Sequence, residues 1–260
     1  MGALIDAIID AINTNNTLGR QNLRDKGVVV AENATTYEIM SAIADVSGGG
    51  SASTEQSISD FWNIYQDGGN RVDYSTAFGG VGWNNETFKP KHNMQPTNAY
   101  MMFRNSGIVG DLVDILEELG VEIDFSATTN PGYIFNAAKG ITRVGKIDVT
   151  SSTNSTKADS IFTNCTNLKR IEEFVVNSST TFGASCFKGC PALEYIGFSG
   201  AISNSLSIPN SPLLTVGCVD GIIAHLATVS TKQTLTLDAS VSVSEAQKTA
   251  ISGKNWQLVQ

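Results

Sequence analysis

The chain has 260 residues with 17 basic and 25 acidic side chains, which gives a net charge of −8 at pH 7. An acidic surface repels phosphate, and no run of Lys or Arg interrupts it, so the composition argues against partners that are nucleic acids or anionic membranes. Hydrophobic residues make up 41% of the chain, enough for a buried core, but no stretch approaches the roughly 20 apolar residues that span a bilayer.

Residues 1–46 are expected to form an N-terminal helical anchor of two short helices. Helices this short are not stable alone in water, so they must pack on each other, on the rest of the chain or on other subunits. The narrow apolar stripe suggests self-association, in a homo-oligomer with a trimer as one option. Asp6 and Asp10 interrupt the first apolar run, so it does not read as a signal peptide, and we expect synthesis in a cytoplasm. The apolar stripe of the first helix comprises Leu4, Ile5, Ile8, Ile9 and Ile12.

A Gly/Ser-rich linker at 47–56 separates this anchor from a pre-repeat region at 57–125 that is rich in Gly and aromatic residues. Within it, residues 111–120 predict a helix, because an acid stands at the start and Gly stands where a left-handed terminator belongs. Apolar residues then alternate over 121–125, which predicts a strand.

Three aromatic residues of this region, Trp62, Trp83 and Phe88, allow two interpretations. Aromatic side chains in a Gly- and Asn-rich segment can form a carbohydrate-stacking platform or an interface hot spot. They can also form the local core of a region that has few aliphatic residues. We favour the core.

The strongest signal is a repeat in which apolar or small residues recur at matching offsets. Its leading phenylalanines, at 135, 162 and 187, are 27 and then 25 residues apart, within the range of leucine-rich repeats. A degenerate earlier copy begins at Phe103. The first copy comprises Phe135, Ala138, Ile141, Val144 and Ile147; the second comprises Phe162, Cys165, Leu168, Ile171 and Phe174; the third comprises Phe187, Cys190, Leu193 and Ile196, with Phe198 closing it early.

Cys165 and Cys190 occupy the same position of the repeat, and Ala138 takes that position in the first copy. The substitution indicates that the position requires a small residue rather than a thiol. The four cysteines form no C-x-x-C pair and the two histidines are far apart in sequence, which argues against a zinc site. The sequence predicts no catalytic residue, no metal site and no cofactor.

Residues 211–260 are expected to form a C-terminal α/β cap. A helix is predicted over 219–229, a strand over 234–240, and a second helix over 244–253, where Ser244 and Gln247 make a capping box and Gly253 ends the helix. The predicted fold class is therefore α+β, with a short leucine-rich-repeat solenoid at 126–210 between the helical anchor and this cap.

The pattern F-x-x-C-x-x-L-x-x-I, in IFTNCTNLKRI and CFKGCPALEYI, resembles the BspA-type leucine-rich repeats of bacterial surface proteins and of phage structural proteins. Three further segments are similar to the phage branch of that family. They are FWNIYQDGGNRVDYSTAFGGVGWNNETFKPKHNMQP before the repeats, SGIVGDLVDILEELGVEIDFSAT leading into them, and TLTLDASVSVSEAQKTAISGKNWQLV at the end. Together these segments and the repeats cover most of residues 57–260.

The resemblance implies a virion structural protein that is not an enzyme, with no catalytic residues to carry over. A tail-fibre, baseplate or head-fibre component would contact other virion proteins and a bacterial cell-surface glycan or protein, and would leave the host by lysis. Two alternatives remain open: a decoration (cement) protein of the capsid or tail with no host ligand, and a bacterial surface adhesin. A cell-wall hydrolase is a further alternative, which zymography would detect.

Overall fold

The computed structural model describes residues 72–90, 93–154 and 157–260. The anchor residues Leu4 to Ile12, the linker at 47–56 and Trp62 lie outside the described residues.

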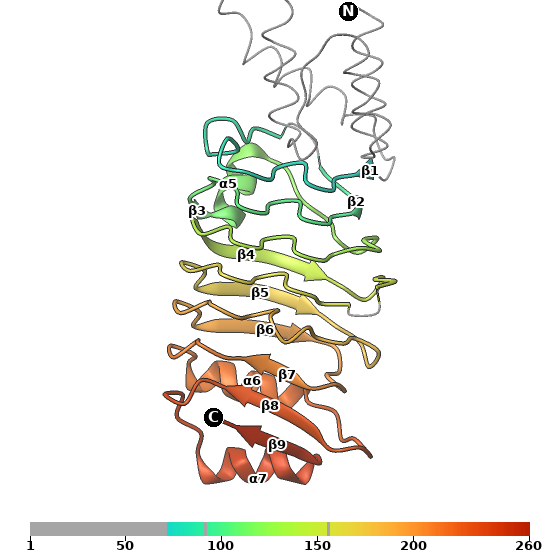
Figure 1. Ribbon diagram of the computed structural model, residues 1–260, viewed down its shortest axis with the longest axis vertical. Coiled ribbons are helices and arrows are strands. Elements are labelled where there is room, and N and C mark those ends of the chain that lie inside the picture. The colour runs from blue at the N-terminus through green and yellow to red at the C-terminus, as the bar shows by residue number, and fades with distance from the viewer. Residues whose placement is uncertain (1–71, 91–92, 155–156) are drawn as a thin grey trace, which may run out of the picture.

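The described chain forms short strands and three helices, which follow one another down a column (Figure 1). The strands are β1 (Val72–Asp73), β2 (Pro96–Asn98), β3 (Gly110–Asp111), β4 (Ile141–Asp148), β5 (Arg170–Val175), β6 (Tyr195–Ser199), β7 (Leu206–Ile208), β8 (Gln233–Leu237) and β9 (Trp256–Val259). The helices are α5 (Leu112–Leu119), α6 (Val216–His225) and α7 (Glu245–Gly253).

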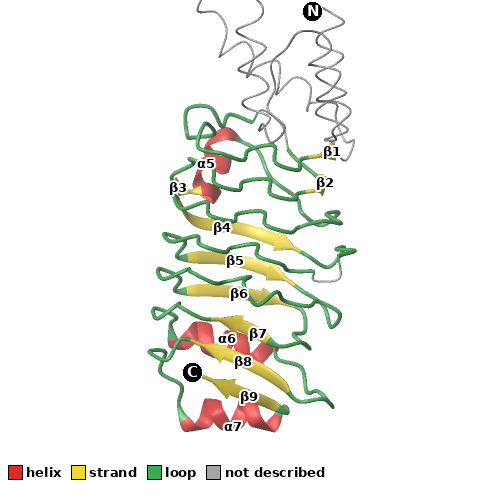
Figure 2. Cartoon of the chain, viewed as in Figure 1, coloured by secondary structure: helices red, strands yellow, loops and turns green. Residues whose placement is uncertain are grey.

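The strands belong to three parallel sheets, β1-β2, β3-β4-β5-β6 and β7-β8-β9, and within each sheet neighbours in space are neighbours in sequence. Because neighbouring strands are parallel, the chain must return to the same end of the sheet between one strand and the next. Here it returns through turns and loops, and each circuit, which we call a coil, lies below the one before it (Figure 2).

Equivalent positions of successive repeats face each other across these strands. Val144 pairs with Ile171, and Ile171 in turn pairs with Ile196. The register between β5 and β6 shifts after Ile171, so that Phe174 pairs with Phe198. This shift is the structural reason why Phe198 arrives one residue early in the sequence pattern.

A ladder of stacked phenylalanines runs through the centre of the column. The Phe135 and Phe162 ring centroids are 5.7 Å apart with the planes 5° from parallel, and Phe162 and Phe187 are also 5.7 Å apart at 13°. Phe103, which begins the degenerate copy, stacks on Phe135 at 5.2 Å and 6°, and Phe78 lies 5.2 Å beyond Phe103. The ladder therefore contains two more phenylalanines, Phe103 and Phe78, on the N-terminal side of the three clear repeats.

The backbone around every ring of the ladder except Phe187 makes the same pair of bends. Two residues with positive φ flank the ring, one on each side at a distance of two residues, as Tyr133 (60°) and Ala137 (57°) flank Phe135. The pair at Ser160 and Asn164 flanks Phe162 in the same way. The amide of Phe135 donates to the Ile161 carbonyl of the next coil at 2.9 Å. Each tight bend is thus tied to the bend below it by a backbone hydrogen bond.

Three local expectations are tested by the helices. The helix at 111–120 is confirmed: Asp111 accepts hydrogen bonds from the amides of Val113 and Asp114, and Gly120 has a left-handed φ of 67°. The capping box of α7 is also confirmed. The predicted end of this helix at Gly253 is confirmed, with Gly253 as the last helical residue and Lys254 as the C-cap.

Candidate functional site

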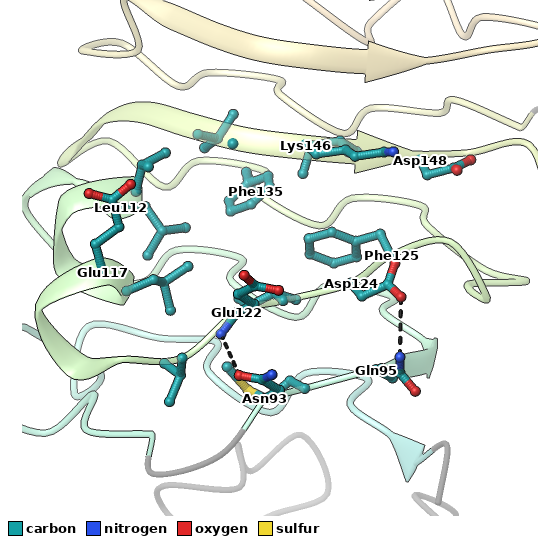
Figure 3. Close-up of a pocket in the computed structure, with 18 residues that line it drawn as sticks. Asn93, Gln95, Leu112, Glu117, Glu122, Asp124, Phe125, Phe135, Lys146 and Asp148 are labelled. Atoms are coloured by element: carbon teal, nitrogen blue, oxygen red, sulfur yellow. Dashed lines mark hydrogen bonds between the residues drawn. The ribbon is translucent and has the colours of Figure 1, made fainter. Parts of the chain in front are cut away.

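A pocket of about 500 Å³ opens between β4 and residues 121–125, beside α5 (Figure 3). Its size lies in the range of about 300–1,000 Å³ that is typical of ligand sites. Its apolar wall includes the buried residues Leu112, Phe125, Phe135 and Val144, whereas polar side chains stand at its rim.

The pocket exists because α5 interrupts the stacking of the coils. β3 pairs with β4 over only two positions, Gly110 with Ile141 and Asp111 with Arg143, and then Asp111 starts the helix. A helix is about 10 Å wide, whereas paired strands lie about 4.8 Å apart. The helix therefore holds the next segment of chain away from β4, and the part of β4 after Arg143 has no strand partner on this side among the described residues.

The strand predicted over 121–125 is wrong for the same reason. Only Ile123 forms a β-bridge, to Met94 in the preceding coil. The Met94 amide donates to the Glu122 carbonyl and the Asp124 amide donates to the Met94 carbonyl, both at 2.8 Å. Because alternate residues of an extended chain direct their backbone groups to opposite sides, the amide and carbonyl of Ile123 point away from Met94. Within the described part of the chain, neither makes a hydrogen bond.

Charge at the rim is predominantly negative. Glu117, Glu122, Asp124 and Asp148 line the pocket, against the single ammonium of Lys146 (Figure 3). A hydrogen bond from the Ser126 backbone amide is the main cause that lowers the pKa of Asp124. Gln95 donates a further hydrogen bond to this carboxylate at 3.2 Å. Asp124 is therefore ionised at neutral pH, and the rim favours a cationic group.

The repeat residues, which the sequence pattern directs inward, lie in the core and form no surface site. Each of them is buried, and Ala138, Leu168 and Leu193 are no more than 1% exposed. The structure places them all in the continuous core, and it brings only Phe135, Val144 and Ile147 to the wall of the pocket.

The two cysteines of the repeat have a role that the sequence did not suggest. The Cys165 thiol donates to the Phe135 carbonyl at 2.9 Å, and the Cys190 thiol donates to the Phe162 carbonyl at 3.0 Å. Each thiol thus ties its coil to the one before it. Burial raises the pKa of Cys190 to about 12 and that of Cys165 well above its usual value, so both are protonated at neutral pH.

Trp83 and Phe88 lie in the core above the first repeat. Trp83 is 1% exposed and meets Phe78 edge to face, with the ring centroids 5.2 Å apart. Phe88 is fully buried and meets the same ring at 5.1 Å. Neither offers a ring face to solvent, so they do not form a stacking platform for a ligand.

The rim of the pocket was missed by sequence reasoning. One signal was available: Phe103 and Phe135 are 32 residues apart, longer than the spacings of 27 and 25 that follow, and the extra length contains α5. What a longer coil does to its neighbours depends on where the insertion falls in the stack, which the spacing does not give.

A comparison of the chain with models of known families found no match, and comparisons with curated proteins and with solved structures likewise found none. Among the described residues, no group of three or more His, Cys, Asp or Glu side chains could hold a metal ion. None of the described helices is long and apolar enough to cross a membrane.

Proposed function

We propose that this chain is a structural protein of a bacteriophage particle, and that its stacked coils are leucine-rich repeats of the BspA type. The observation that carries the proposal is the phenylalanine ladder, since the residues that define the repeat motif in the sequence stack on one another coil after coil. Stacking of one equivalent residue per repeat is what a solenoid requires, because a single coil cannot bury its own apolar face.

In this proposal the column is a projecting body, and residues 1–46 attach it to the particle as an oligomer. Contact with the bacterial surface, through a glycan or a protein, would be weak for one copy and strong for many copies acting together. The protein has no enzymatic activity in this role.

The proposal is tested on purified particles from the bacterium that carries the gene. Mass spectrometry should detect the protein in particles banded on a density gradient, and antibody labelling should place it on the tail or on fibres. Its absence from banded particles would overturn the proposal.

Binding separates attachment from decoration. The purified full chain should bind cells of the host strain and should compete with particles for adsorption. A decoration protein would give a different result. Particles made without it would adsorb normally but would be less stable to heat than particles that carry it.

A further inference from the structure

The pocket beside α5 combines two properties: backbone edges on both sides that have no strand partner among the described residues, and a carboxylate rim. We propose that it binds an extended peptide with basic side chains, which adds a strand between β4 and residues 121–125. The occupant is a segment of another protein, and the inference does not depend on the assignment to a phage particle.

Both walls of the pocket present backbone groups that an extended peptide can pair with. Ile123 directs an amide and a carbonyl away from Met94, and β4 beyond Arg143 has no strand on the α5 side among the described residues. An extended peptide satisfies such edges through its own amides and carbonyls, the mode by which strands add to open sheets. A small organic cation would leave most of these backbone groups without partners.

Size agrees with a short segment of strand. The part of β4 that lacks a partner on the α5 side, residues 144–148, is matched by about five residues of extended chain at about 3.3 Å per residue. At the end of the pocket that follows β4, the two coils are in contact again, since the Ser151 hydroxyl donates to the Ser126 carbonyl at 2.7 Å. At the other end the helix residues Val113 and Leu116 form the wall. The opening is thus bounded at both ends.

The side chains around the pocket determine which residues the peptide should carry. Alternate residues of a strand face opposite ways, so one set would face the apolar wall that includes Phe125 and Val144. The other set would face the rim, where Glu117, Glu122 and Asp124 favour Lys or Arg. The matching sequence alternates apolar and basic residues.

Binding is measured by fluorescence anisotropy of the full-length protein with a labelled six-residue peptide of alternating lysine and valine, blocked at both ends. We expect saturable binding. A peptide of alternating glutamate and valine should bind at least about tenfold more weakly, and so should a lysine–valine peptide N-methylated at alternate amides. Equal binding of the methylated peptide would overturn the strand mode, and no binding of any peptide would overturn the site.

Gly145 allows a steric test, because it lines the pocket and an added Cβ would meet nothing closer than Val113 Cγ2 at 3.6 Å. Gly145→Ala should fold and keep most of the binding, whereas Gly145→Leu should fill the pocket and weaken binding by at least about tenfold. Thermal melting checks that both variants are folded. Unchanged affinity in folded Gly145→Leu would contradict the proposal.

Two neighbours on α5 provide a matched pair for charge. Glu117 lines the pocket and Glu118 does not, so Glu117→Gln should weaken binding by about threefold to fivefold and Glu118→Gln should leave it unchanged. Equal effects of the two variants would show that the acidic chain attracts the peptide without a defined site. That result would overturn the inference even if Gly145→Leu folds poorly.

Discussion

At the scale of single residues, the bends around the phenylalanine ladder force ordinary residues into a left-handed conformation. Thr76 (58°), Tyr133 (60°) and Ala137 (57°) have positive φ, whereas Gly189 (75°) takes a corresponding bend in a later coil without a Cβ. For a residue with a Cβ, this conformation costs about 1–2 kcal/mol. Each non-glycine bend therefore lowers stability, and the coil-to-coil hydrogen bonds of the ladder offset this loss.

Ala137 and Ala138 are adjacent and differ in this respect. Ala137→Gly removes the left-handed cost and adds about 0.5–1 kcal/mol of chain entropy, so we expect the free energy of unfolding to rise by about 0.5 kcal/mol. Ala138 is fully buried and has no positive φ, so Ala138→Gly should lower it by about 1 kcal/mol. Urea unfolding of the two variants provides the comparison, and a loss of equal size in both would refute the explanation.

The buried thiols make stability depend on alkaline pH. Burial raises the pKa of Cys165, Cys186 and Cys190, the last to about 12, so they stay protonated in the folded protein. In the unfolded chain each titrates near about 8.5, so the unfolded state gains thiolates above that pH. The stabilising contribution is complete below about pH 8.5 and is lost as pH rises towards the folded pKa.

We therefore expect the free energy of unfolding to fall between pH 8.5 and 10, by about 1.4 kcal/mol per pH unit for each such thiol. Denaturant titrations under reducing conditions measure the slope. Cys190→Ala supplies the control: its slope should be smaller by the contribution of one thiol. A variant with the slope of the parent chain would contradict the assignment.

At the scale of elements, α5 is held at its start by one side chain with two functions. Asp111 Oδ1 accepts from the Val113 amide at 2.9 Å, and Asp111 Oδ2 pairs with Arg143 at 2.9 Å. The first contact caps the helix, and the second fixes the helix start to β4 at the edge of the pocket. Local signals in the sequence were sufficient to predict this helix, because both capping residues, Asp111 and Gly120, are next to it in the chain.

Substitution separates the two functions of Asp111. Asp111→Asn keeps the capping oxygen and loses the ion pair, which is partly exposed, so it should cost no more than about 1 kcal/mol. Asp111→Ala loses both and should cost about 1–2 kcal/mol more. Asp114→Asn tests the exposed neighbour and should have little effect. If thermal unfolding shows the same loss of stability for Asp111→Asn and Asp111→Ala, Asp111 does not stabilise the helix by capping it.

The segment after α5 could not be predicted in the same way. Residues 121–125 alternate like a strand, but a strand needs a partner, and the partner position is set by the helix inserted before it. The same holds for the pocket, whose wall combines β4 with residues of the segments 93–95 and 112–125. Alternation of apolar residues shows that a segment can pair as a strand. Whether it does so depends on the packing of segments that are distant in sequence.

At the scale of the whole molecule, repetition is what made the core predictable. The spacing of 27 and 25 residues placed Phe135, Phe162 and Phe187 in one ladder, because equal offsets in stacked coils meet in space. Phe78 belongs to the same ladder, but its surroundings do not match the repeat pattern, so it was not recognised. Neighbouring aromatic contacts, including those of Trp83 and Phe88, continue the core above it.

The interrupted pairing between β4 and residues 121–125 also has a mechanical consequence. Hydrogen bonds between coils run along the column, so a tensile force applied to its two ends acts on them directly. Where strands pair along their length, as β4 does with β5, several bonds share the load, whereas on the α5 side strand pairing ends at Arg143. A stretched molecule should therefore part at this level before it parts between β4 and β5, with the Phe103–Phe135 contact among the last to separate.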